Sequence, residues 1–319
     1  MTASAHAAWA VAVDSPLAQL LSYRADGPLH AGALVRVPLG PRRVTGVVVG
    51  PAAASDGPAT LRAVAGVFAG IPPLAPAWMQ LAQFAASYYQ RPLGEIVAAS
   101  LPPPLLDNEP GYLERVLDRL VEPAYVATAA GRRAITGGVP ERFAALRELA
   151  LRASSGPLTP SEARNLHRDA ARHLAGWYEA GWLTIAPTEP ARLQVHDGPP
   201  LTAAQADAVD VVLRNAAGAR QPQLLWGATG SGKTEVYMQV AQQVLMGNDT
   251  VQVLVLVPEI NLTPQLEATF RERFGGCEIV TLHSGLSDGE RLRHWLKAHL
   301  GVARIVLGTR MAVLASLPR

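Results

Sequence analysis

The residues whose types and spacing most clearly suggest a chemical role form a glycine-rich segment, GATGSGKT, at residues 227–234. It satisfies the pattern G-x-x-x-x-G-K-[ST], with an apolar run before it and a helical pattern after it, as a phosphate-binding loop requires. The glycines allow backbone N–H groups to point at phosphate oxygens beside a positively polarised helix end. This segment therefore predicts a binding site for the phosphates of a nucleoside triphosphate.

Side chains in and near the loop complete the predicted site. We expect Lys233 to neutralise the β- and γ-phosphates of ATP and Thr234 to ligate Mg²⁺, and we predict both as the catalytic residues. Upstream, Gln205 either presents its amide to adenine or is an exposed glutamine at a helix start. The predicted nucleotide-binding residues are Gly227, Ala228, Thr229, Gly230, Ser231, Gly232, Lys233, Thr234 and Gln205.

Polar residues follow three further apolar runs of the same segment. They are VPEINLTPQ after Val257, LHSGLSDGER after Leu282 and GTR after Leu307. In an open α/β sheet, ligands collect outside the carboxyl ends of the strands, so we expect these loops to lie along one rim with the P-loop. Their hydroxyls, backbone amides and Arg310 suit a phosphodiester backbone, while the alternative is ordinary loop and cap residues.

The segment that carries these motifs, residues 197–319, alternates apolar runs with helical patterns. QLLW, VQVLVLV, EIVTL and ARIVL are the predicted strands. Strands that alternate with helices predict a parallel sheet, and the fold class expected for the whole chain is multidomain α/β.

The first segment, residues 1–108, is β-rich. The runs AWAVAV, GALVRVPLG and RVTGVVVG predict a small sheet or barrel, with a hairpin loop at PLGPRR. A helix over PAWMQLAQFAASYYQ is expected to carry Trp78, Leu81, Phe84 and Ala85 on one face. LPPPLLDNEPG then has the composition of a linker.

The middle segment, residues 109–196, has the order helix, short helix, helix, strand of a winged helix-turn-helix. PERFAALRELALRA predicts the first helix, and Thr159 and Glu162 predict a capping box around Pro160 for the second. Three arginines recur at four-residue intervals and either face phosphates or form a solvated surface: Arg164, Arg168 and Arg172.

Composition limits the possible classes of protein. With 319 residues, 17% charged residues and a net charge of +2, the sequence is typical of a globular protein that does not bind DNA by bulk charge. Neither a membrane span nor a signal peptide is expected, which favours the cytoplasm. The single cysteine, Cys277, excludes a multi-thiolate zinc site within these residues.

Together the motifs resemble the PriA family of replication-restart DNA helicases, also called primosomal protein N-prime, of superfamily 2. LLWGATGSGKTEVYMQV, VLVLVPEINLTPQL, LHSGLSDGERLRHW and ARIVLGTRMAV carry the resemblance to its first RecA-like lobe. PLAQLLSY, GALVRVPLGPRRVTGVVV and ASYYQRPLGEIVAASLPPPL are similar to its 3′-DNA-end-binding domain.

The resemblance implies contacts with DNA as well as with ATP and Mg²⁺. Pro258, Glu259, Thr309 and Arg310 would lie along a single strand. A 3′-terminal nucleotide would be captured by positions that match Tyr23, Gly40 and Arg62. Here the chain departs from the family, because Leu21 and Ser22 stand where an aromatic residue and Asp are common, and Ser22 can hydrogen-bond a 3′-hydroxyl only without charge.

The family's function would be replication restart: recognition of branched DNA with a 3′ leading-strand end, 3′ to 5′ unwinding, and primosome assembly that loads the replicative helicase. Its implied partners are fork DNA, single-stranded DNA, primosome proteins and single-stranded-DNA-binding protein, at the nucleoid. The family's D-E-x-H element, cysteine-rich Zn²⁺ region and second lobe have no counterpart in these residues. We therefore expect the 319 residues alone not to hydrolyse ATP.

Two other classes of function remain open from the sequence. One is a non-catalytic fork-recognition module with a nucleotide-binding lobe. The other is a nucleoside or small-molecule kinase, which shares the P-loop but does not need the VPE and GTR loops or a winged helix.

Overall fold

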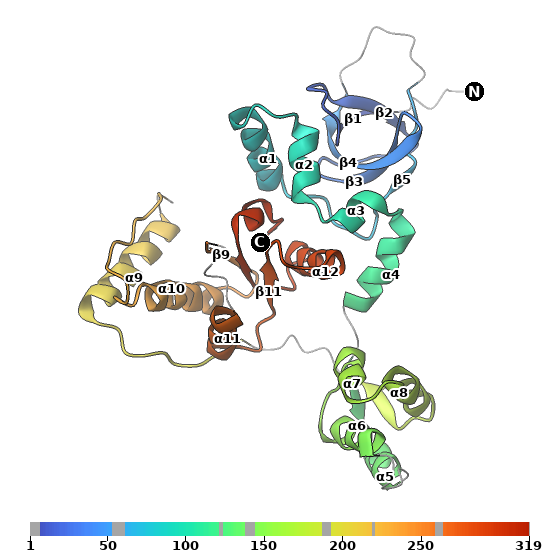
Figure 1. Cartoon of the computed structure of the whole chain (residues 1–319), viewed down its shortest axis with the longest axis vertical. Helices are drawn as coiled ribbons and strands as arrows, with labels where there is room; N and C mark the ends of the chain where they lie inside the picture. Colours follow the sequence, from blue (N-terminus) through green and yellow to red (C-terminus); the bar gives the residue numbers. More distant parts are fainter. Residues whose placement is uncertain are drawn as a thin grey trace. The chain divides into compact units, whose positions relative to one another are not determined.

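The structure is a computed structural model that describes residues 7–52, 61–120, 124–137, 144–186, 193–218, 221–258 and 264–318. The chain forms two compact units (Figure 1). One combines Met1–Arg115 with Leu193–Arg319, and the other is Val116–Arg192. No helix in the described ranges has the length and apolar character needed to cross a membrane.

The amino-terminal part of the first unit is a five-stranded antiparallel sheet of order β2-β1-β4-β3-β5. Its strands are β1 (Ala7–Val13), β2 (Leu21–Ala25), β3 (Leu34–Leu39), β4 (Arg42–Pro51) and β5 (Gly66–Val67). The residues just before β5 bond back to β2, because Arg24 N–H donates to the Arg62 carbonyl at 3.0 Å and Val64 N–H to the Arg24 carbonyl at 2.9 Å. The sheet is therefore closed into a barrel, which is one of the two forms that the sequence predicted.

The predicted hairpin lies at the β3–β4 turn. Leu39 pairs with Arg42, and Gly40 between them has a φ of +60°, which glycine adopts without strain. Alternating valines fill the barrel core, with Val11, Val35 and Val37 fully buried.

Helix α1 (Pro76–Tyr88) follows the barrel and begins at the predicted proline. Its buried residues are Trp78, Met79, Ala82 and Ala85. The predicted face is wrong for Leu81 and Phe84, which are 38% and 63% exposed. Two alanines allow a close approach on the buried face, so packing rather than side-chain size decides the orientation of this helix.

The residues predicted as a linker, 101–111, are instead packed against the barrel. After α2 (Leu93–Ser100) they form α3 (Pro103–Asp107) and the start of α4 (Pro110–Leu120), and Leu105 is fully buried. Prolines begin both helices, which explains why a proline-rich composition was mistaken for a linker.

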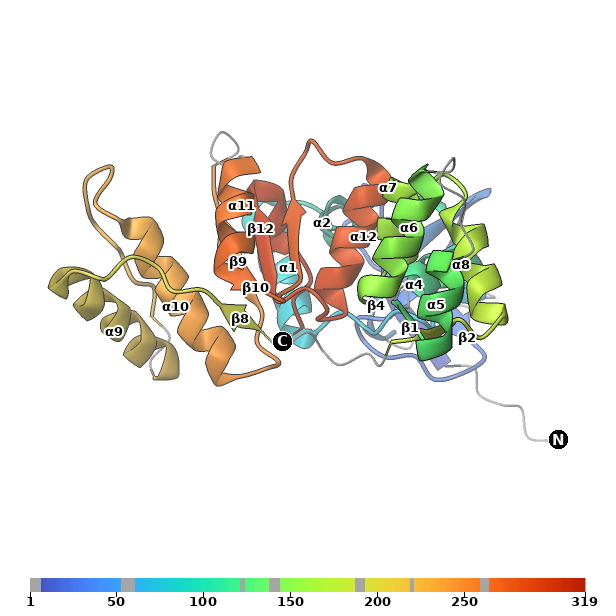
Figure 2. The same cartoon turned by 90° about the horizontal axis from the view of Figure 1, so that it is seen from below.

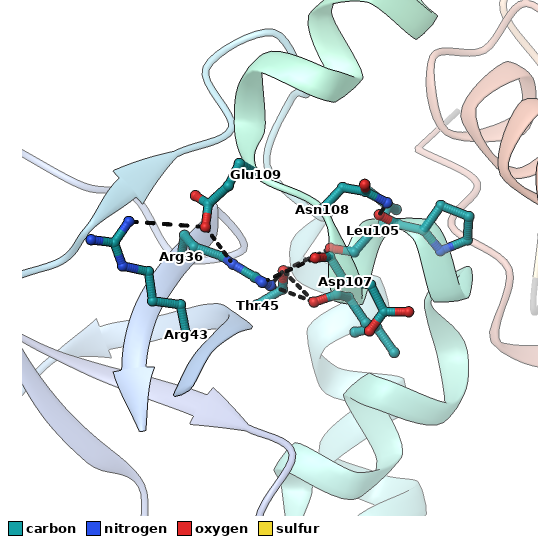
Figure 3. Close-up of polar contacts among 9 residues, drawn as sticks. Arg36, Arg43, Thr45, Leu105, Asp107, Asn108 and Glu109 are labelled. Atoms are coloured by element: carbon teal, nitrogen blue, oxygen red, sulfur yellow. Dashed lines mark hydrogen bonds and ion pairs between the residues drawn. The ribbon is translucent and has the colours of Figure 1, made fainter. Parts of the chain in front are cut away.

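A buried arginine holds this segment in place (Figure 3). Arg36, 6% exposed on β3, donates from Nη1 to the Thr45 hydroxyl at 3.0 Å and to the Leu106 carbonyl, and from Nη2 to the Asp107 carbonyl at 3.2 Å. Glu109 lies 3.5 Å from its Nε. Because the last carbonyls of a helix lack intrahelical partners, the guanidinium acts as a C-cap for α3.

The second unit has the predicted winged helix-turn-helix order. It contains β6 (Tyr125–Ala127), α5 (Ala129–Gly137), α6 (Ala144–Ser155), α7 (Pro160–Leu166), α8 (Ala170–Glu179) and β7 (Leu183–Ile185). β6 pairs antiparallel with β7, and the core includes Leu149, Leu158 and Leu174. The predicted start of α6 at 140–143 and the side chain of Glu162 lie outside the described residues.

The carboxyl-terminal part of the first unit contains the predicted parallel sheet, of order β11-β12-β9. Its strands are β9 (Val253–Leu256), β11 (Ile279–Leu282) and β12 (Ile305–Gly308), and its helices are α9 (Ala203–Ala217), α10 (Lys233–Gly247), α11 (Pro264–Arg273), α12 (Asp288–His299) and the 3₁₀ helix η2 (Arg310–Leu314). Successive β12 residues enter opposite cores: Ile305 packs with α10 and α11 residues, and Val306 with α12 and η2 residues. β8 (Gln194–Val195) pairs separately with β10 (Phe274–Gly275).

The predicted strand QLLW before the P-loop is not formed. Residues 221–228 have no strand pairing, and Leu224 and Trp226 are 85% and 89% exposed. A β-strand requires the hydrogen-bonding edge of another strand, and none of β9, β11 and β12 pairs with this segment. This segment connects α9 to α10 in the sequence, and the two helices pack against each other (Figure 2).

Candidate nucleotide-binding and DNA-binding sites

The P-loop has the geometry of a phosphate cradle. Gly230 and Gly232 have φ values of +81° and +78°, and α10 begins directly after them at Lys233. A Cβ on Gly227 would lie 2.6 Å from the Ser231 hydroxyl, so the serine side chain would have to rotate to admit one. The conformation thus uses the glycines as predicted and leaves a helix N-terminus facing the loop.

Lys233 folds back over this loop. Its Nζ donates to the carbonyls of Gly227 and Ala228, each at 2.7 Å. Thr234 is an exposed residue in the first turn of α10. Phosphate oxygens would compete with the two carbonyls for the ammonium, so the donor set fits a triphosphate with Mg²⁺.

Gln205 is joined to the P-loop. Its Oε1 accepts from Thr202 N–H at 2.9 Å in the capping box of α9, and its Nε2 donates to the Ser231 carbonyl at 3.1 Å. Both ends of the amide are therefore occupied by protein groups. A contact with adenine would require the amide to exchange these partners.

The α10 helix is anchored to the rest of its part by an ion pair. Arg273 on α11 contacts Glu235 on α10 at 2.7 Å, with only 6% and 14% of the two side chains exposed. Since both side chains are largely buried, loss of one partner would leave the other charge buried and unpaired. This pair fixes the helix whose first residue is Lys233.

The three parallel strands end at one rim. Val257 N–H donates to the Gly308 carbonyl at 2.9 Å, and Thr309 N–H to the Leu282 carbonyl at 3.1 Å. Pro258, Thr309 and Arg310 follow these ends directly, and Glu259 lies outside the described residues. Arg310 is exposed, whereas Thr309 is buried, so the rim offers the arginine side chain and main-chain groups.

The residues predicted to hold a 3′ end gather at the β3–β4 turn of the barrel. Arg62 donates from Nη1 to the Gly40 carbonyl at 2.9 Å, and the Tyr23 hydroxyl donates to the Pro38 carbonyl at 3.0 Å. Tyr23 is only 3% exposed, and burial raises the pKa of its phenol. The tyrosine therefore supports the turn from inside, and Arg62 and Gly40 form its exposed surface.

Leu21 and Ser22 lie on opposite faces of β2. Leu21 packs with Tyr23 in the barrel core, so the alternation of the strand directs Ser22 outward. In the second unit, Arg164 and Arg172 are exposed on α7 and α8, and Arg168 lies in the turn between them. Contact of these residues with DNA stays a prediction.

Sequence reasoning missed a buried polar face of α12. Arg291, Trp295 and His299 are spaced by four residues, so they lie on one face of this helix. His299, 1% exposed, pairs through Nδ1 with the Ser316 hydroxyl and through Nε2 with the Pro72 carbonyl, both at 2.8 Å. The four-residue spacing was the available signal, but the Pro72 carbonyl that His299 contacts is 227 residues away in the sequence.

A second missed contact joins the same two parts. The indole Nε1 of Trp78 on α1 donates to the Leu314 carbonyl at 2.8 Å. With the His299 contact, this bond attaches the helices that follow the barrel to the end of the parallel-sheet part. The two parts therefore form one compact unit.

Comparisons with known proteins agree with this arrangement. Residues 10–102 match the family described as 3'DNA-binding domain (3'BD). Residues 199–317 match the family described as Type III restriction enzyme, res subunit.

Three curated relatives share the name replication restart protein PriA. The one from Haemophilus influenzae is 33% identical over 320 residues, which cover 95% of this chain and 42% of that protein. The one from Synechocystis is 46% identical over 144 residues, 43% of this chain and 17% of that protein. The Bacillus subtilis protein is 48% identical over 92 residues, 29% of this chain and 11% of that protein. The chain thus spans less than half the length of these relatives.

Proposed function

The chain belongs to the family of the replication restart protein PriA, and we propose that it recognises a 3′ DNA end at a fork and grips ATP. The complete protein would unwind DNA from 3′ to 5′ and begin primosome assembly for loading of the replicative helicase. The observation that carries this proposal is the presence in one chain of both matches, to a 3′DNA-binding domain and to a P-loop lobe.

The nucleotide would be held by the P-loop. Backbone N–H groups of residues 227–232 would surround the phosphates, and Lys233 would exchange the carbonyls of Gly227 and Ala228 for phosphate oxygens. The hydroxyl of Thr234 would ligate Mg²⁺. Bound ATP would supply the free energy for unwinding in the complete protein.

These 319 residues contain no D-E-x-H sequence. A carboxylate that orients the attacking water is required for hydrolysis by P-loop enzymes. We therefore propose that these residues alone bind ATP without hydrolysing it at a useful rate. Phosphate release that is stimulated by fork DNA and abolished by Lys233→Ala would contradict this.

On the DNA side, two surfaces are proposed. The β3–β4 turn with Gly40 and Arg62 would receive the 3′ end, and the rim with Pro258, Thr309 and Arg310 would follow the single strand. The partners would be fork DNA, primosome proteins and single-stranded-DNA-binding protein, in the cytoplasm at the nucleoid.

The deciding experiment compares two forks that differ only at the 3′ end of the leading strand. We expect a fork with a 3′-hydroxyl to bind about tenfold more tightly than one with a 3′-phosphate, because the added phosphate prevents the hydroxyl contact. Arg62→Gln should weaken binding of the hydroxyl fork and reduce the difference between the two. Dissociation constants from fluorescence anisotropy measure both effects.

The control is Arg91→Gln. It removes an exposed arginine that does not belong to the β3–β4 turn and whose Nε lies 3.0 Å from the Glu95 carboxylate. It should leave the preference for a hydroxyl end intact. Equal affinity of the wild-type chain for both forks would refute the 3′-end site.

A further inference from the structure

A carboxylate lies close to the phosphate-binding end of α10. Glu235 is in the first turn of this helix, just after Lys233 and Thr234, and its N–H donates to the Gly232 carbonyl at 3.0 Å. A helix N-terminus attracts anions, so this carboxylate and the phosphates of ATP would compete for the same positive end. A carboxylate without a counter-charge would also repel the nucleotide. Phosphate binding therefore favours a neutralised Glu235.

Arg273 on α11 supplies the neutralising charge. Its Nη2 donates to the Oε1 of Glu235 at 2.7 Å, and Gln239 donates from Nε2 to the same oxygen at 3.0 Å. Both side chains of the ion pair are largely buried, so water screens their attraction only weakly. The pair therefore cancels most of the negative charge that a nucleotide in the P-loop would otherwise meet.

A third segment packs directly on this ion pair. Residues 193–198 follow the second unit in the sequence, and the His196 N–H donates to the Arg273 carbonyl at 2.9 Å. A Cβ on Gly198 would lie 1.9 Å from Nη1 of Arg273 and 2.5 Å from Oε1 of Glu235. A methyl group there would displace both charged ends from their contact. The glycine thus leaves the room in which the ion pair forms.

We propose that Arg273 sets the affinity of the P-loop for the phosphates of ATP by neutralising Glu235. It is a positioning residue that acts through the carboxylate, since its own side chain is buried. The pair lets α10 carry an acidic first turn, which stabilises the helix, without repelling the nucleotide. The inference rests on the proposed binding of ATP and adds a determinant of affinity that lies outside the P-loop motif.

The test is a double-mutant cycle on ATP binding in the presence of Mg²⁺. Arg273→Met keeps the aliphatic packing but leaves Glu235 without its counter-charge, and it should weaken binding by about tenfold. Adding Glu235→Gln to Arg273→Met removes the carboxylate charge, and affinity should return to within about twofold of the wild type. If the pair only anchored α10, the double variant would bind as weakly as the single one. Isothermal titration calorimetry of the 319-residue chain measures the dissociation constants.

The charge of the nucleotide provides a second measurement. ADP carries one negative charge fewer than ATP, so Arg273→Met should lose less affinity for ADP than for ATP, by a few-fold. A displaced P-loop without repulsion would weaken the binding of both nucleotides by the same factor.

Gly198→Ala tests the same claim with both charged residues present, and it serves where Arg273→Met does not fold. The added methyl group should separate the pair and weaken ATP binding by a few-fold. Adding Glu235→Gln to Gly198→Ala should restore the affinity, because no negative charge is then released beside the phosphates.

The matched control is Arg271→Met on the same helix. Arg271 contacts Glu267 at 2.7 Å, but half of the Arg271 side chain and a third of the Glu267 side chain are exposed. The carboxylate left behind is solvated, so ATP affinity should change by less than about twofold. Circular dichroism melting confirms that each variant is folded at the temperature of the titrations.

The outcomes separate this inference from the proposed function. Wild-type affinity in both Arg273→Met and Gly198→Ala, or double variants as weak as the single ones, would refute the role of Arg273 and leave the proposed binding of ATP standing. Equal losses for ATP and ADP would also contradict it. Absence of ATP binding by the wild-type chain would refute the proposed function, and this inference with it.

Discussion

The barrel and the P-loop segment differ in how their structures are completed. The barrel is closed by its own backbone through Arg24 and Arg62, and its core valines are fully buried. The segment before the P-loop pairs with no described strand and exposes Leu224 and Trp226. Yet the glycine turn itself forms in both regions, at Gly40 and at residues 227–232.

The difference separates two kinds of sequence signal. A glycine turn depends on the local backbone and needs few partners, so it forms wherever the chain permits a positive φ. A strand depends on a neighbouring edge, so a run such as QLLW becomes a strand only in the presence of that edge. In this chain the glycine motif formed its turn without a pairing partner, whereas the apolar run QLLW did not form a strand.

The largest expected effect compares two leucines. Leu34→Ala, at a position 1% exposed on strand β3, should lower the free energy of unfolding by about 3 kcal/mol because it leaves a cavity. Leu224→Ala, at a position 85% exposed, should change it by less than about 0.5 kcal/mol. Urea unfolding followed by circular dichroism measures both. Equal costs would mean that the segment before the P-loop is buried in solution, and the comparison would fail.

A smaller effect is expected from the arginine that links the barrel to α3. Arg36→Met keeps the aliphatic packing but leaves the Leu106 and Asp107 carbonyls without their donor, at a cost of about 2 kcal/mol. Arg43→Met removes an exposed arginine 4.0 Å from Glu109 and should cost less than about 0.5 kcal/mol. Thermal unfolding of the two variants distinguishes them. A matching loss for both would show that surface charge, and not the cap on α3, supports this segment.

The smallest effect concerns the contact between the barrel helices and the parallel-sheet part. Burial lowers the pKa of His299, and its hydrogen bond to Pro72 opposes this only in part. Since the unfolded chain binds the proton more readily, stability is complete above about pH 6.5 and falls as the pH decreases below it. One proton contributes at most about 1.4 kcal/mol per pH unit.

His299→Gln keeps a donor for the Pro72 carbonyl but does not titrate. Its stability should therefore decline less than that of the wild type between about pH 6.5 and pH 5, by about 1 kcal/mol in urea unfolding. His294, whose pKa is also lowered mainly by burial, is present in both proteins and cancels in the difference. Parallel pH profiles would mean that His299 is solvated and that the two parts separate readily.

Much of the fold was predictable where a segment has a clear hydrophobic periodicity of a helix or of a strand. Alternating valines predicted a small sheet or barrel, and the order of helices and strands predicted the winged helix and the parallel sheet. The P-loop conformation followed from its glycines. In each case the information lies within a few neighbouring residues.

The rest depended on distant partners. The orientation of α1 was set by the packing of Ala82 and Ala85, so Leu81 and Phe84 were misplaced. No partner for Arg36 could be read from the sequence, because the carbonyls that satisfy it lie some 70 residues away in the chain. The role of His299 on α12 became apparent only from its contacts with Pro72 and Ser316, which the fold creates.

Arg62 connects the mobility of the barrel to events at the β3–β4 turn. Its carbonyl accepts the bond that closes the barrel, and its side chain reaches Gly40. A partner that holds the Arg62 guanidinium in place would therefore also restrain the hydrogen bond between Arg24 and the Arg62 carbonyl. Both contacts belong to the same residue, so Arg62 cannot move away from β2 while its side chain stays at the β3–β4 turn. A DNA end held at the turn would therefore make local opening of the barrel slower without changing its average structure.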